Sequence, residues 1–194
     1  LASHLRQIVG VEYDAAELRR ATPSAPANAL LVQGDAAALP LADASVDLVI
    51  CAQVYEHVAD ADALAAEVYR VLTPGGVCFF SGPNRLDPIE RHYGLPFLSW
   101  LPRGLANAWV RRTGRGQAYA ERPRTYRGLR RLWRQFDIND YTLAALRDPQ
   151  HFCVADELGR HVWVSRLPTP LLRALRPFYP NYNWVLRKKR GGRS

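Results

Sequence analysis

The stretch over residues 46–84 constrains the fold of this chain more than any other part of the sequence. Residues 46–51 form an almost unbroken apolar run, which is typical of a strand buried on both faces. Asp60 can cap a helix after this strand, because the apolar residues that follow it recur at the 3.6-residue period. Residues 73–76, Thr-Pro-Gly-Gly, are expected to end the helix, and residues 77–81 to form a second buried strand. A strand, a crossover helix and another strand in so short a stretch predict a βαβ unit with parallel strands.

Acidic residues follow the two strands that we expect before this unit. Residues 7–12 read as a strand that ends at Glu12, and residues 29–34 as a strand that ends before Asp35. Parallel sheets bind their ligands beyond the carboxyl ends of the strands. We therefore expect a ligand site that includes these two acids and the residues that follow the strands of the βαβ unit.

The regular alternation of strands and helices breaks down after residue 84. Residues 85–123 contain prolines, glycines and aromatic residues scattered among arginines, which is typical of an insertion. The other predicted elements are a helix over residues 15–21 capped by Asp14, a helix capped by Thr125, a strand over residues 137–143, a short helix opened by Thr169 and a closing strand over residues 182–186.

Charge and cysteine content limit the kinds of partner and compartment. Residues 1–84 carry a net charge of −6 and residues 85–194 one of +14, which together give the +8 of the chain. A basic half indicates an anionic partner, such as nucleic acid, a membrane surface or a phosphorylated substrate, although an arginine-rich solvated surface is the alternative. No apolar run approaches the length that spans a bilayer. The three cysteines lack C-x-x-C spacing, so we expect reduced thiols in a cytoplasmic protein.

Five motifs in the first half of the chain resemble those of class I S-adenosylmethionine-dependent methyltransferases of the type 11 group. In chain order they are VGVEYD, GDAAALPLADASVDLV, DLVICAQVYEHV, EVYRVLTPGG and FFSGPN. The resemblance covers residues 1–84 well and the rest loosely. It implies an α/β, Rossmann-like, doubly wound and mostly parallel sheet with an antiparallel C-terminal hairpin, and S-adenosylmethionine as the cofactor. A single domain over residues 1–194 would then comprise a cofactor-binding half (1–84), an insertion or substrate lid (85–123) and a C-terminal half with a helix and the hairpin (124–194).

The glycine-rich G-x-G-x-G loop of this family is absent from the chain. In dinucleotide-type sites the ribose-binding acid lies about 20 residues after that loop, so counting back from Glu12 places the loop before Leu1. The chain also contains no methionine. We therefore expect a chain truncated before the first strand and the glycine loop, and a natural protein without the loop is the alternative.

The resemblance also assigns cofactor contacts to residues at the ends of the strands. Glu12 is expected to accept hydrogen bonds from the ribose hydroxyls, and Asp35 one from the adenine amino group. A surface glutamate and a turn-forming aspartate are the alternatives. The other expected cofactor contacts are Tyr13, Ala36, Gln53 and Val54.

The catalytic prediction rests on two histidines. A neutral imidazole suits deprotonation of an acceptor near pH 7, so His57 is the predicted base and His92 its rival. Positioning alone often suffices for transfer from a sulfonium. A Glu-x-x-Glu-His run at this place binds a divalent cation in some quinone-type O-methyltransferases, but Gln53 holds the first position here, so no metal is expected. The predicted acceptor contacts are Tyr55, Asn84, Tyr93 and Trp100.

The function expected from this resemblance is methyl transfer to a small-molecule or lipid-linked acceptor, with oxygen as the methylated atom. Over residues 95–115 the insertion holds a set of apolar and aromatic residues with arginines close by, which suits peripheral attachment to an anionic membrane; a hydrophobic lid is the alternative. RNA methylation is the rival activity, but no appended RNA-binding module is visible, so nucleic acid is not the expected partner. A non-catalytic scaffold is the rival outside the enzymes. The sequence leaves the oligomeric state open.

Overall fold

The structure is a computed structural model, and it describes residues 2–154 and 159–189. Its strands are β1 (Ile8–Glu12), β2 (Ala29–Gln33), β3 (Val46–Ala52), β4 (Leu72–Pro83), β5 (Ile89–Glu90), β6 (Leu95–Pro96), β7 (Phe136–Asp140) and β8 (Asn181–Lys188). Its α-helices are α1 (Ala15–Ala21), α2 (Ala61–Val71), α3 (Arg103–Arg112), α4 (Tyr126–Leu132), α5 (Thr142–Arg147) and α7 (Thr169–Leu175). Short 3-10 helices are η1 (Ala2–His4), η2 (Thr22–Ser24), η3 (Leu98–Trp100), η4 (Gly159–Arg166) and η5 (Arg176–Phe178).

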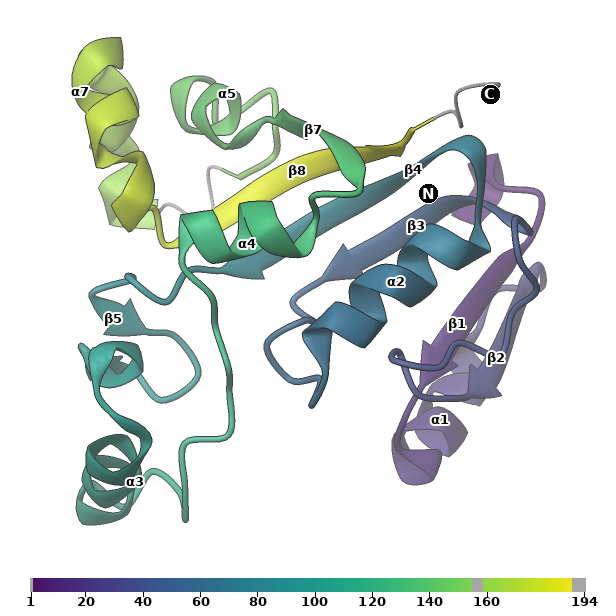
Figure 1. Ribbon diagram of the computed structural model, residues 1–194, viewed down its shortest axis with the longest axis horizontal. Coiled ribbons are helices and arrows are strands. Elements are labelled where there is room, and N and C mark those ends of the chain that lie inside the picture. Colours follow the sequence, from purple (N-terminus) through teal and green to yellow (C-terminus); the bar gives the residue numbers. More distant parts are fainter. Residues whose placement is uncertain (1, 155–158, 190–194) are drawn as a thin grey trace.

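The strands form a mixed sheet of the predicted kind. β3 pairs with β4 in parallel, and β8 lies between β4 and β7 and is antiparallel to both (Figure 1). β1 and β2 form a second parallel pair. These pairings confirm the Rossmann-like α/β class and the antiparallel hairpin at the C-terminal end. They also bring the carboxyl ends of β3 and β4 next to the amino end of β8, where a site can form.

In the described part of the chain, β1 and β3 are both edge strands of their sheets. Within residues 2–154 and 159–189, β1 pairs only with β2, and β3 pairs only with β4. Ile50 of β3 is 52% exposed although its strand is strongly apolar. The first strand that the family resemblance places before residue 1 stays a prediction.

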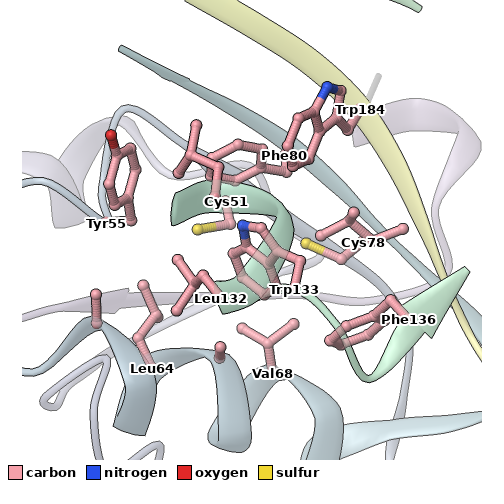
Figure 2. Packing of buried hydrophobic residues seen from close by; sticks show 14 of the residues in the cluster. Cys51, Tyr55, Leu64, Val68, Cys78, Phe80, Leu132, Trp133, Phe136 and Trp184 are labelled. Carbon is pink, nitrogen blue, oxygen red and sulfur yellow. The ribbon is translucent and has the colours of Figure 1, made fainter. Parts of the chain in front are cut away.

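One face of the four-stranded sheet is covered by α2 and α4, and the core lies there (Figure 1). Asp60 caps α2 by accepting from the backbone N–H groups of Asp62 and Ala63, as its position before the apolar period predicts. Phe80 of β4 is fully buried at the centre, with its ring 5.6 Å from Tyr55, 5.2 Å from Trp133 and 5.6 Å from Trp184 (Figure 2). The aromatic cluster therefore joins β4 and β8 to the segments that follow β3 and α4.

Two predicted boundaries were wrong. Residues 73–76 end α2 as expected, but they lie inside β4, because Leu72 already pairs with Val46 and a register shift follows. The strand predicted over residues 137–143 ends at Asp140. The Asp140 carboxylate accepts a hydrogen bond from the backbone N–H of Thr142 at 3.0 Å, and this contact starts α5.

The insertion forms a small unit that projects from the sheet at the lower left of Figure 1. β5, β6, η3 and α3 bury their own cluster, made of Leu95, Leu98, Ala106, Val110 and Tyr119. None of the helices in the described part of the chain combines the length and the apolar character needed to cross a membrane.

Replacement of Phe80 by alanine should reveal how strongly this core holds the sheet. Phe80→Ala removes a fully buried ring, so the free energy of unfolding should fall by about 3–5 kcal/mol. Phe79→Ala is the matched control: it removes the same ring from the next position of the strand, where the side chain faces the opposite side of the sheet and is 39% exposed. Urea denaturation of both variants measures the difference, and equal losses would contradict this account of the core.

Candidate functional site

The two predicted acids lie at neighbouring strand ends. β1 and β2 are parallel and in register from Ile8 to Glu12, and the N–H of Gly34 donates to the carbonyl of Glu12 at 3.0 Å. One carboxylate oxygen of Glu12 accepts from the N–H of Asp14, and one of Asp35 accepts from the N–H of Ala37, both at 2.8 Å. Within the described residues, the second oxygen of each carboxylate has no hydrogen-bond partner, so each acid holds its turn and still offers an acceptor.

The other predicted cofactor residues differ in what they can offer. Tyr13 is 75% exposed and follows Glu12, so its ring is accessible at the end of β1. Ala36 and Val54 are partly buried, and their side chains pack against the core cluster. The side chains of these two residues therefore support the core, and their backbone groups offer the polar contacts.

Gln53 begins a polar network at the carboxyl end of β3. Its backbone is in the left-handed region, with φ of 55°, and its N–H donates to the carbonyl of Ser81 at 2.8 Å. Its side-chain amide donates to Asn181 at 3.0 Å and to the hydroxyl of Ser81 at 3.3 Å. Asn181 in turn donates to Ser81 at 2.8 Å and to Asn183 at 3.2 Å. The network ties β3, β4 and β8 together at one edge, and a non-glycine residue with positive φ is typical of a functional site.

A cavity of about 550 Å³ opens beside this network. It lies against the sheet face opposite the core, between the strands and the segment that includes α5 and residues 152–154. Its apolar wall includes Phe79, Phe152 and Val185. The polar residues of the wall are Gln53, Ser81, Arg91, Tyr141, Asn181 and Asn183. A volume of this size suits a small molecule rather than a macromolecule.

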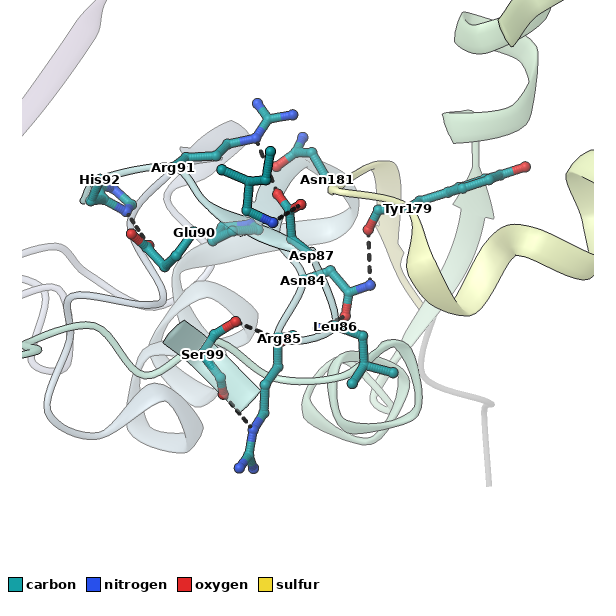
Figure 3. A network of polar contacts seen from close by, with 12 residues as sticks. Asn84, Arg85, Leu86, Asp87, Glu90, Arg91, His92, Ser99, Tyr179 and Asn181 are labelled. Carbon is teal, nitrogen blue, oxygen red and sulfur yellow. Dashed lines mark hydrogen bonds and ion pairs between the residues drawn. The ribbon is translucent and has the colours of Figure 1, made fainter. Parts of the chain in front are cut away.

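Two of the predicted acceptor contacts are buried and make hydrogen bonds within the fold. Tyr55 is fully buried, and its hydroxyl donates to the carbonyl of Pro83 and accepts from the N–H of Arg124 at 2.9 Å. Asn84 is also buried, and its amide donates to the carbonyls of Pro177 and Tyr179 at 2.7 and 2.8 Å (Figure 3). Neither side chain lines the cavity, because these hydrogen bonds tie both of them into the fold.

The other two predicted acceptor contacts belong to the insertion. The hydroxyl of Tyr93 donates to the carbonyl of Ala118 at 3.0 Å, and its ring packs against Tyr119. The indole N–H of Trp100 donates to the carbonyl of Asp87 at 3.2 Å, and its ring lies 5.0 Å from that of Phe97. Neither residue lines the 550 Å³ cavity.

The two rival histidines are neighbours in the structure. The rings of His57 and His92 lie 5.0 Å apart in an edge-to-face contact, although one follows β3 and the other comes from the insertion. Both lie near Glu56, whose side chain is fully buried. Burial raises the pKa of Glu56 to about 7. The insertion therefore completes a titratable cluster next to Arg91, which lines the cavity.

The residues of β8 that face the cavity were missed, although the sequence carries a signal for them. In Asn-Tyr-Asn-Trp-Val-Leu, Tyr182, Trp184 and Leu186 are fully buried. The period of two places Asn181 and Asn183 on the opposite face of β8. An asparagine pair on one face of an otherwise apolar strand is the pattern that predicts a polar wall.

Comparisons with known proteins give a family match for the first part of the chain and fold matches for most of it. Residues 1–80 match the family of methyltransferase domains. A probable S-adenosylmethionine-dependent methyltransferase of Mycolicibacterium smegmatis is 41% identical over 86 residues, which are 44% of this chain and 33% of that protein. The matched part thus spans about one third of the length of the curated relatives.

Solved structures show the same fold over most of the chain. An S-adenosylmethionine-dependent methyltransferase from Mesorhizobium loti aligns with a TM-score of 0.55 and 17% identity, over 94% of this chain and 80% of that one. The YcgJ protein from Bacillus subtilis aligns with a TM-score of 0.55 and 15% identity, over 98% of this chain and 85% of that one. Residues 1–80 therefore resemble the methyltransferase domain family, and the chain shares the α/β fold of these solved structures.

Proposed function

We propose that this chain transfers a methyl group from S-adenosylmethionine to an oxygen atom of a small-molecule or lipid-linked acceptor. The observation that carries the proposal is the pair of carboxylates at the neighbouring ends of β1 and β2. Glu12 and Asp35 each keep one oxygen without a partner among the described residues, at the sheet edge where ligands of parallel sheets bind.

The residues present fit the cofactor that this fold uses. Glu12 would accept from the ribose hydroxyls and Asp35 from the adenine amino group, while Gln53 would lie beside the methionine end. Bound S-adenosylmethionine supplies an electrophilic methyl group on a sulfonium. The residues of this chain bind and orient the two reactants and keep water from the reacting atoms, which is where much of the rate enhancement for such a transfer originates.

The cavity supports a small acceptor. It begins at Gln53, so an acceptor inside it lies next to the expected methionine end of the cofactor. Phe79, Phe152 and Val185 supply an apolar wall, and Arg91 supplies a cationic group at the wall. This combination favours an apolar molecule that carries a polar or anionic group.

A lipid-linked acceptor is supported by the outer surface of the insertion. Ile89, Phe97, Trp100 and Leu105 are 58%, 48%, 40% and 60% exposed. Ile89 and Phe97 are neighbours, because Ile89 pairs with Pro96 in the β5–β6 hairpin, and the ring of Phe97 contacts that of Trp100. Arg111, Arg112 and Arg115 of the same unit are exposed. Exposed aromatic rings with nearby arginines suit an anionic membrane surface.

Replacement of Glu12 by glutamine tests the cofactor assignment. Glu12→Gln keeps the size of the side chain and removes the charge, so the affinity for S-adenosylmethionine should fall by about 1.5–3 kcal/mol, the usual strength of hydrogen bonds to a charged group. Glu17→Gln on the exposed surface of α1 is the control, and it should leave the affinity unchanged. Isothermal titration calorimetry measures both, and equal affinity of the Glu12 variant and the parent would remove the assignment.

Vesicle binding tests the membrane surface. Association should rise with the content of anionic lipid and fall with added salt, because salt screens the arginines over a Debye length of about 8 Å at physiological ionic strength. Trp100→Ala should weaken it even at low salt, whereas Trp163→Ala removes an exposed tryptophan outside the insertion and should not. Co-sedimentation with RNA as competitor separates this outcome from binding to nucleic acid, which depends on phosphate contacts. No salt-dependent pelleting with anionic vesicles would exclude the membrane surface.

A further inference from the structure

The side chain of Glu56 carries a carboxylate into the interior of the protein. It is fully shielded from solvent, and neither carboxylate oxygen has a hydrogen-bond partner among the described residues. Its backbone is held in place, because its carbonyl accepts from the N–H of Arg122 at 2.8 Å. An ionised carboxylate in such a position is costly unless a cation or a set of donors compensates it. A cation bound next to Glu56 would offset this cost.

Two more buried acids surround Glu56. Glu90 and Glu121 are 6% and 7% exposed, and their charges act on Glu56. One oxygen of Glu121 also has no hydrogen-bond partner among the described residues. Arg103 comes close, but its guanidinium donates to the backbone carbonyl of Glu121. The three carboxylates together create a negative potential that attracts a cation into this space.

His92 is oriented in the way that metal-binding histidines usually are. Its Nδ1 lies 3.0 Å from a carboxylate oxygen of Glu90 (Figure 3), whose other oxygen accepts from the N–H of Tyr93 at 2.8 Å. When Nδ1 carries the proton and donates it to Glu90, Nε2 keeps its lone pair for a ligand. A carboxylate behind the imidazole fixes the ring and raises the basicity of the coordinating nitrogen.

The ligand atoms of the three residues converge. Nε2 of His57 lies 3.8 Å from Oε1 of Glu56, and the ligand atoms of Glu56, His57 and His92 all lie within 4.8 Å of one another. A tetrahedral ion with bonds of 2.0–2.2 Å places its ligands about 3.4 Å apart. The side chain of His57 is 45% exposed, so it is free to close the remaining distance and leaves one side of the site accessible.

We propose that Glu56, His57 and His92 bind a divalent transition-metal cation of the Zn²⁺ class. Two imidazoles and one carboxylate form a mixed nitrogen and oxygen set that suits Zn²⁺ and its neighbours better than Mg²⁺ or Ca²⁺. Three protein ligands leave a coordination position open on the exposed side. The cation neutralises the buried carboxylate. The two histidines then act as metal ligands and not as a general base.

This ligand set differs from the one that the sequence led us to consider. Gln53 is not part of it, because its amide is bonded to Ser81 and Asn181. The third ligand comes from the insertion instead, 35 positions after His57. Metal binding here does not depend on methyl transfer, so each proposal can fail while the other holds.

Metal titration of the chelator-stripped protein, without S-adenosylmethionine, tests the site. Calorimetry with Zn²⁺ should show one ion per chain, and Co²⁺ should give the intense visible absorption of a low-symmetry site. Glu56→Gln and His92→Ala should each lower the Zn²⁺ affinity more than about 100-fold, and Glu90→Gln, which removes only the support of His92, by roughly 10–100-fold. His4→Ala, a histidine on the surface of η1, is the matched control and should bind as the parent does.

A second measurement separates loss of the site from loss of the fold. Zn²⁺ in excess should raise the melting temperature of the parent and of His4→Ala, because a ligand that binds only the native state stabilises it. Glu56→Gln removes a buried charge, so it should fold without metal and show no rise. The proposal is overturned if the stripped parent fails to bind one Zn²⁺ or one Co²⁺ ion per chain. It is also overturned if Glu56→Gln and His92→Ala bind Zn²⁺ as tightly as the parent does.

Discussion

The packing of Phe80 against three other aromatic rings is the contact on which the rest of the structure depends. β4 lies inside its sheet, and its side chains point alternately to the core on one face and to the cavity on the other. Phe80 points into the core and contacts Tyr55, Trp133 and Trp184, while Phe79 and Ser81 point to the cavity. A change in the tilt of β4 would therefore move the cavity wall and the core together. Close packing of the aromatic cluster on one face of the sheet therefore limits how far the cavity wall on the other face can move.

Short-range sequence signals predicted the bounds of the first helix and the first three strands. The helix after Asp14 has the expected bounds because the aspartate caps it, and β1, β2 and β3 agree within one residue because apolar runs mark buried strands. Local signals failed where a distant partner decides. Residues 73–76 look like a turn, yet they remain in β4 because Leu72 pairs with Val46. The strand predicted to continue to residue 143 ends at Asp140, where Tyr141 and Thr142 exchange hydrogen bonds with Asn183 of β8.

The site was only partly predictable, for the same reason. Acids at strand ends follow from topology, so the positions of Glu12 and Asp35 at neighbouring strand ends could be predicted, while their contacts with the cofactor stay a prediction. Tyr55 and Asn84 lie in the right loops, but their polar atoms are used by Arg124 and by residues 177–179, which are far away in the sequence. The contact between His57 and His92 depends on how the insertion folds back, and no periodicity encodes that. Burial of Glu56 is likewise a property of the assembled chain.

The three cysteines differ in a way that makes the cavity experimentally accessible. Cys51 and Cys78 are buried in β3 and β4, and burial raises the pKa of both thiols, so neither reacts readily. Cys153 is exposed and belongs to the cavity wall. A maleimide dye or a nitroxide added to the native protein would therefore attach at this one position among the three, without any engineered substitution. The fluorescence or the spin spectrum of that label would then report when a molecule enters the cavity.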